Sequence, residues 1–206
     1  MTTDTEIVNV ALRRIGAARI SSLDNDSAKE AVAARDLYHE ARRDLLSLHT
    51  WNFAIKRRSI SASATSPTFG WTYAYEIPED FIRLISVHPT NDDRTKIEYR
   101  LEFQSSLDRI ILCDAESPIY IRYIWDLQDP NLMTPTFRDA LSLRLARDLA
   151  MALSKSAAAA DLASRELARV LSRAKSIDGI EDWPEKMDDG SWIKSRFQNT
   201  SEREYE

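Results

Sequence analysis

Hydrophobic positions near the start of the chain recur at the three- and four-residue spacing of an amphipathic helix. Thr3-x-x-Glu6 is a capping box, in which the hydroxyl and the carboxylate each bind a free backbone amide at a helix start. Gly16 can adopt the left-handed conformation that ends a helix. We therefore expect a first helix from about Asp4 to Ile15.

A second helix is expected from about Ala28 to Leu48, with Ser27-x-x-Glu30 as its cap. Its apolar residues alternate spacings of three and four: Ala31, Ala34, Tyr38, Ala41, Leu45 and Leu48. Such a narrow stripe suits close packing against another helix. The charged residues on the other faces, including Arg42 and Arg43, predict a solvated face or a polar contact between subunits.

The segment Leu48-His49-Thr50-Trp51-Asn52-Phe53-Ala54 is where the helical spacing stops. After it, apolar residues occupy alternate positions for about seventy residues, as in strands. Because the segment holds two large aromatic side chains, we expect Trp51 and Phe53 to be buried and to fix a joint between a helical body and a β-rich insert.

Six strands are expected in this insert, over residues 54–60, 71–77, 81–87, 96–103, 109–113 and 119–125. In the last of them one face carries Ile119, Ile121, Tyr123 and Trp125, and the other carries Tyr120, Arg122 and Ile124. Short polar connections such as Asn91-Asp92-Asp93 predict antiparallel hairpins or a meander, and hence a small sheet or barrel.

Strong helix signals return at Thr134-Pro135, where Thr caps a helix and Pro occupies its first turn. This third helix carries a broad apolar face and is expected to be central. A fourth helix is expected from about Ala157 to Ile177, ended by Gly179. Its apolar spacing matches that of the second helix, so the two are expected to pack together or to pair across subunits.

These elements predict an α+β fold: an antiparallel four-helix body with an inserted antiparallel β sheet or small barrel, and an extended C-terminal arm. The helical body comprises residues 1–54 and 130–179, the insert residues 55–129, and the arm residues 180–206. A chain of 206 residues with 43% hydrophobic residues can bury such a core.

Charge is distributed unevenly along the chain. Between Asp178 and Glu206 there are nine acidic and four basic residues, which accounts for the whole net charge of −5. The remaining chain is neutral, so it has no overall electrostatic attraction to nucleic acid. The arm is polar but contains apolar side chains suited to docking into pockets on another surface: Trp183, Trp192, Ile193, Phe197 and Tyr205. The alternative is that the arm folds back on its own domain.

The sequence lacks the motifs of common enzymes. No glycine-rich loop could hold a phosphate, and the three histidines and the single cysteine, Cys113, do not have the spacing of a zinc site. We therefore expect no catalytic residues, no cofactor and no metal. The alternative is a cell-wall hydrolase that uses a carboxylate pair, such as Glu79/Asp80 or Asp92/Asp93, although solvated loops are the simpler interpretation.

The main basic cluster comprises Arg42, Arg43, Lys56, Arg57 and Arg58. It lacks the interleaved aromatic residues of single-strand binding surfaces, so a contact between subunits or a channel-facing role is favoured over a nucleic-acid-binding module. The first six residues lack the basic and apolar regions of a signal peptide, and no apolar run approaches the ~20 residues that a membrane span needs. We expect synthesis in the host cytoplasm and no membrane insertion.

The order of three segments resembles a known family. The first segment is Asn9-Val10-Ala11-Leu12-Arg13-Arg14-Ile15-Gly16. The second follows a long helix and reads His49-Thr50-Trp51-Asn52-Phe53-Ala54. The third is Gly70-Trp71-Thr72-Tyr73-Ala74-Tyr75-Glu76-Ile77-Pro78-Glu79-Asp80-Phe81-Ile82-Arg83. From about Glu6 to Ile177 the chain resembles the head-to-tail adaptor proteins of short-tailed bacteriophages, also called tail tubular protein A or tail accessory proteins.

This resemblance implies a structural virion protein at the head-tail junction. Members of the family form a homo-oligomeric ring, dodecameric in known cases, beneath the portal protein. The ring extends the channel for genome ejection, through which DNA passes without sequence-specific binding, and carries the tail nozzle protein. The helical part meets the portal and neighbouring subunits, and a C-terminal arm can bind the portal. Some adaptors have a cell-wall-degrading activity, but no residue here matches it.

Overall fold

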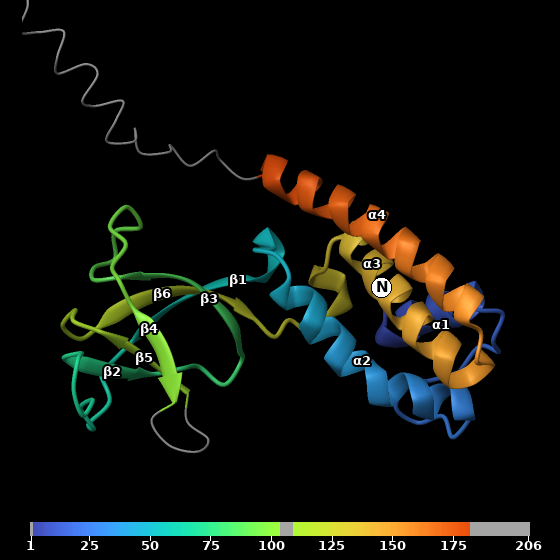
Figure 1. Cartoon of the computed structure of the whole chain (residues 1–206), viewed down its shortest axis with the longest axis horizontal. Coiled ribbons are helices and arrows are strands. Elements are labelled where there is room, and N and C mark those ends of the chain that lie inside the picture. Colours follow the sequence, from blue (N-terminus) through green and yellow to red (C-terminus); the bar gives the residue numbers. More distant parts are fainter. Residues whose placement is uncertain (1, 104–108, 182–206) are drawn as a thin grey trace, which may run out of the picture.

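The helices and the strands occupy opposite sides of the molecule (Figure 1). The structure is a computed structural model that describes residues 2–103 and 109–181. Within these residues the chain leaves the helical side after α2, forms all of its strands, and returns to the helical side before α3. This mixture of helices and antiparallel sheets agrees with the predicted α+β class.

Local hydrogen bonds define α1, which spans Asp4–Arg14. The predicted capping box is confirmed: Glu6 N donates to Thr3 Oγ1 at 3.2 Å, and Thr3 N donates to Glu6 Oε2 at 3.3 Å. Gly16 follows with a φ of 70°, a left-handed conformation that glycine adopts without strain.

The start of α2, which spans Lys29–Ser47, differs from the prediction. Ala28 is the N-cap residue, and no side chain caps the helix, so the predicted cap at Ser27 is wrong. The carboxylate of Asp26 instead accepts hydrogen bonds from Ala28 N at 2.9 Å and from Ser21 N at 3.0 Å. These two bonds close the preceding loop and lower the pKa of Asp26 below its usual value.

The central helix is α3, which spans Pro135–Leu149 and contacts α1, α2 and α4. Thr134 caps it as predicted, since its hydroxyl accepts from Phe137 N at 3.4 Å. A π-helical turn, η3 (Ala150–Ser154), leads to α4, which spans Ala157–Glu181. Because α4 continues through Gly179, the prediction that this glycine ends the helix is wrong. Within the chain, α4 packs on α3 and not on α2.

The strands form two antiparallel three-stranded sheets, ordered β1-β6-β3 and β2-β5-β4. Their bounds are β1 Ile55–Ile60, β2 Tyr73–Glu76, β3 Phe81–His88, β4 Arg100–Phe103, β5 Arg109–Cys113 and β6 Ile119–Trp125. The sequence predicts antiparallel hairpins or a meander. Only β4 and β5 are neighbours both in sequence and in a sheet, so the meander alternative is wrong. The last strand instead inserts between β1 and β3.

Side chains of β6 contribute to two hydrophobic cores. Ile119, Ile121 and Tyr123 face the core between the two sheets, which confirms the alternation expected from the sequence. Ile124, on the opposite face, joins the core of the helices, where it lies with α2 and α3 side chains. Because one strand belongs to both cores, the helices and the sheets pack as one structure.

Candidate functional site

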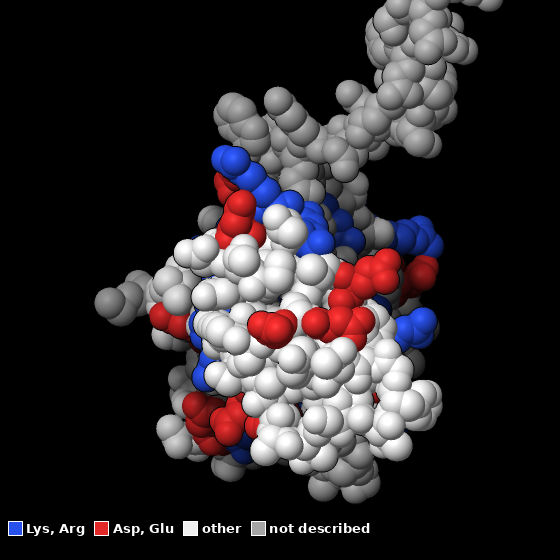
Figure 2. All heavy atoms as spheres, turned by 90° about the vertical axis from the view of Figure 1, so that its left-hand side faces the viewer, with Lys and Arg blue, Asp and Glu red and all other residues white. Residues whose placement is uncertain are grey.

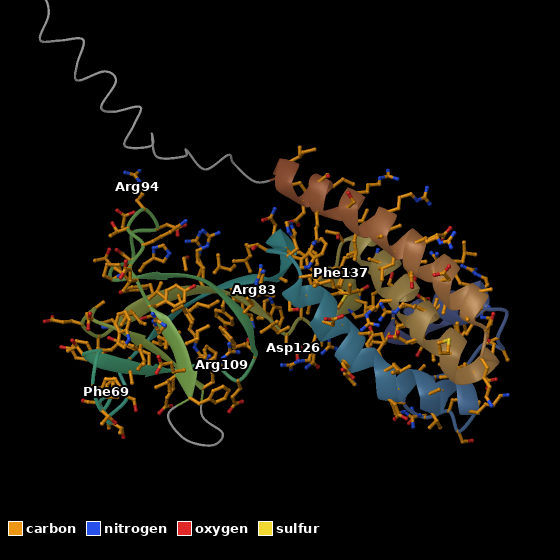
Figure 3. All side chains as sticks on the ribbon, in the orientation of Figure 1. Phe69, Arg83, Arg94, Arg109, Asp126 and Phe137 are labelled. Carbon is orange, nitrogen blue, oxygen red and sulfur yellow. The ribbon has the colours of Figure 1, made fainter. Side chains whose placement is uncertain are left out.

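The segment between α2 and β1 is anchored by Trp51, which is 1% exposed. Its ring lies 5.2 Å from that of Phe137 in α3, and Phe53 lies 5.1 Å from the same ring (Figure 3). The indole Nε1 donates at 2.9 Å to Leu45 O, a carbonyl at the end of α2 that also accepts from Leu48 N. Trp51 is therefore buried as expected, Phe53 is half-buried, and their role as a joint remains a prediction.

Asp178 links the end of α4 to this segment. Its carboxylate accepts from Asn52 N at 3.1 Å and lies 3.2 Å from His49 Nε2, and its carbonyl accepts from Asn52 Nδ2 at 2.8 Å. Burial raises the pKa of this carboxyl, against the hydrogen bonds from Asn52 and His49, which lower it. The contact was not anticipated, although Asp178 continues the apolar spacing of Ala174.

Two basic residues of α2 bind one carboxylate at the exit of β6. Arg42 Nη2 lies 2.8 Å from Asp126 Oδ1, and Arg43 Nη1 lies 2.8 Å from Asp126 Oδ2. The Arg42 side chain is only 2% exposed, whereas the Arg43 side chain is 50% exposed. The burial of Arg42 differs from the exposed position that the sequence predicted for a solvated face. The buried guanidinium of Arg42 therefore joins α2 to the end of β6.

The other basic residues of the cluster lie on β1. Lys56 Nζ lies 2.7 Å from Asp80 Oδ2 and 3.4 Å from the centre of the Trp125 ring. Arg57 Nη2 lies 2.7 Å from Asp93 Oδ2, and Arg58 is exposed. Four residues of the cluster, Arg42, Arg43, Lys56 and Arg57, therefore bind carboxylates of their own chain. The fifth, Arg58, faces solvent.

Two of the carboxylates weighed for a hydrolase, Asp80 and Asp93, have a lowered pKa, which does not suit a proton donor. Burial raises the pKa of Asp80, but hydrogen bonds from Lys56 and Tyr123 outweigh it and leave the pKa below its usual value. The pKa of Asp93 is also lowered, because contacts with Arg57 and Arg122 outweigh burial. A glycosidase acid needs a raised pKa, so these carboxylates are suited to ion pairs.

Ser86 and His88 on β3 lie within hydrogen-bond distance, with Ser86 Oγ 2.7 Å from His88 Nε2. No other serine and histidine side chains in the described part of the chain are this close. Both side chains are buried, and His88 Nδ1 bonds to Thr95 O at 2.8 Å. The adjacent hollow of ≈ 280 Å³ is lined by His88 but not by Ser86. A substrate therefore has no route to the hydroxyl, and the pair is a structural contact.

A groove of ≈ 470 Å³ lies between α1 and α3. Ile7, Val10 and Pro135 supply its apolar part, and Arg13 and Arg138 are among its charged lining residues. No group of three or more His, Cys, Asp or Glu side chains in residues 2–103 and 109–181 could hold a metal ion. Cys113 is buried, which raises the pKa of its thiol.

The end of the molecule formed by the strands has a broad uncharged area (Figure 2). The connection between β1 and β2 reaches this end, where Phe69 is 86% exposed. The residues expected to form a docking arm, Trp183, Trp192, Ile193, Phe197 and Tyr205, lie outside the described residues. Among the described helices, none is long and apolar enough to cross a membrane.

A model of the tail tubular protein family matches residues 5–171, from the start of α1 to the middle of α4. No curated protein sequence matches the chain. The family match includes the helices α1 to α3, both sheets and the segment that joins them.

Proposed function

The chain belongs to the tail tubular protein family, and from this premise we propose that it is the head-to-tail connector of a phage virion. Membership makes it a structural component of the phage tail. In the proposal, copies form a ring beneath the portal protein, extend the DNA channel and bind the tail nozzle protein. The observation that carries the proposal is the family match over residues 5–171, which includes both the helical and the β side.

The two ends of the molecule suit two different partners. In the proposal, the helices contact the portal and neighbouring copies, and the end of the β side, with its uncharged area and the exposed Phe69, contacts the nozzle (Figure 2). The exposed basic residues Arg43, Arg57 and Arg58 contact neighbouring copies or face the channel. DNA then passes through the ring without sequence-specific binding.

Mixing the protein with its portal protein tests the connector role. We expect a stoichiometric ring on the portal in electron micrographs, because many weak contacts between copies add up once the portal holds the copies together. A matched control replaces the exposed Phe69 by Ser, which should leave the ring on the portal intact and weaken nozzle binding. A protein that remains monomeric with its portal under all conditions would contradict the proposal.

We also propose that residues 182–206 form an arm that binds the portal. A truncation after Glu181 is the suitable test, because α4 continues to Glu181 and Asp178 contacts the α2–β1 segment. We expect weaker portal binding with an unchanged thermal unfolding temperature. A full-length control with Trp192, Ile193 and Phe197 replaced by Ala should lose binding similarly, and portal affinity unchanged in both variants would refute the arm.

A further inference from the structure

Helices α2 and α4 lie on opposite borders of the helical side, with α3 between them (Figure 1). Both run toward the strands. Ser47 at the end of α2 precedes β1, and Asp178 near the end of α4 bonds to Asn52 in the same connection. At the other end, η3, which precedes α4, contacts α2. The two helices are therefore parallel to each other.

The face of α4 that points away from α3 is basic in its middle. Arg165, Arg169 and Arg173 follow one another at a spacing of four residues, so they lie on one face, and all three are exposed. Arg165 pairs with Asp161, but Arg169 and Arg173 form no ion pair with any described residue. Exposed apolar residues flank them, with Leu162 at 62% and Ile180 at 82% exposure. We call these residues the α4 outer face.

The corresponding face of α2 is acidic in its middle. Asp36 and Glu40 are exposed, lie four residues apart, and make no ion pair within the described part of the chain. Val32 precedes them on the same face at 44% exposure, and Arg43, which follows, is paired with Asp126 of its own chain. We call these residues the α2 outer face. Like the α4 outer face, it begins with an exposed apolar residue and carries exposed charges in its middle, here of the opposite sign.

We propose that the α4 outer face of one copy packs against the α2 outer face of the next, and that this contact closes the ring. The inference rests on the connector function proposed above. A ring requires a heterologous contact between two different surfaces of each copy. Parallel helices on opposite borders meet this requirement, because rotation about a ring axis roughly along the helices preserves their direction. Charge complementarity sets the partner, and the flanking apolar residues become buried.

Charge reversal tests this contact without disturbing the core. One variant carries Arg169→Glu and Arg173→Glu, and a second carries Asp36→Lys and Glu40→Lys. Each variant alone faces like charges at every contact, so the concentration for half-assembly should rise on the order of tenfold or more. An equimolar mixture should assemble again as an alternating ring, because reversed faces meet reversed faces and native faces meet native faces. Sedimentation velocity measures both results.

Matched controls change the same charges on the strands. Arg94→Glu with Arg100→Glu, and Glu79→Lys with Glu98→Lys, alter exposed residues of the β side (Figure 3 labels Arg94). These controls should assemble as the native protein does. A single chain with all four changes on α2 and α4 should also assemble, which shows that the reversed residues fold correctly.

Three results would overturn the inference. One is normal assembly of either reversed variant by itself. Another is failure of the mixture and of the fourfold variant while the controls assemble. The third is a normal ring for Arg169→Glu/Arg173→Glu that has lost salt-dependent retention of DNA, which would assign the α4 outer face to nucleic acid. In each of these cases the native protein still forms its ring, so the connector proposal survives; a native protein that never forms a ring refutes both.

Discussion

Arg42 and Arg43 are adjacent in sequence and bind the same carboxylate, yet their surroundings differ. The Arg42 side chain is 2% exposed and that of Arg43 is 50% exposed. An ion pair at the surface contributes little to stability, because water solvates the separated charges almost as well. Removing one partner of a buried pair leaves the other charge without compensation, which is far more costly.

The two arginines therefore give a matched comparison. We expect Arg42→Met to lower the free energy of unfolding by about 1–3 kcal/mol, because Asp126 loses its buried charged hydrogen bond but keeps the one from Arg43. Arg43→Met should lower it by less than about 1 kcal/mol. Denaturant unfolding at neutral pH measures both, and equal losses would contradict the assigned burial.

Trp51 contributes both volume and a hydrogen bond. We expect Trp51→Phe to cost about 1–3 kcal/mol in unfolding free energy, because it removes a buried hydrogen bond to Leu45 O and part of the ring. Trp51→Ala should cost about 3–5 kcal/mol through the cavity beside Phe137. Thermal unfolding with calorimetry measures both. Phe53→Leu, at a half-buried position, is the control and should have the smallest effect of the three.

At the scale of elements, the last turn of α4 is held by Asp178. Replacing Asp178 with Ala removes the acceptors of Asn52 N and the contact with His49. We expect faster amide hydrogen exchange in residues 174–181 and 49–54, and unchanged exchange in α1, because only these segments share the contact. The control is Ser176→Ala, which changes an exposed residue of the same helix turn. Uniform acceleration along the chain would instead indicate global destabilisation.

The acid sensitivity of the β side should depend on Asp80. Its pKa in the folded protein lies below the ordinary value of 3.8, so the unfolded chain binds the proton more readily. The stabilisation is therefore complete above that ordinary value and is lost as pH falls through the folded pKa. Between about pH 6 and about pH 3, unfolding free energy should fall less in Asp80→Asn than in the native protein.

Asp80→Asn should also be less stable at neutral pH, by about 1–3 kcal/mol, because its bonds with Lys56 and Tyr123 lose their charged acceptor. Glu79→Gln is the control, since Glu79 is exposed and adjacent. Denaturant unfolding across this pH range measures both variants. A pH dependence of Asp80→Asn identical to that of the native protein would refute the role of this carboxylate.

For the whole molecule, the proposed contact between α2 and α4 predicts a response to salt. Ion pairs at a subunit contact weaken as ionic strength rises, because the screening length falls from about 14 Å at 0.05 M to about 4 Å at 0.5 M. Self-association in sedimentation velocity should decrease over this range. An increase with salt would indicate that the apolar residues Leu162 and Ile180 dominate the contact instead.

The sequence by itself determined the local features. The Thr3–Glu6 capping box, the Thr134 cap and the alternation along β6 rest on bonds and periods within a few residues, so local spacing was sufficient to predict them. The change from helix to strand after Ala54 and the family resemblance were also readable from residue order. These features depend on backbone geometry that nearby residues set.

Only the tertiary structure decided which distant residues meet. Arg42 carries a charge that predicts exposure, and its burial depends on Asp126, 84 residues away. The insertion of β6 between β1 and β3, and the contact of Asp178 with Asn52, likewise join segments far apart in sequence. Periodicity marks a face as apolar or polar, but many partners can satisfy that face. The choice among them is made by the packing of the whole chain, because each buried charge must find its partner within one shared core.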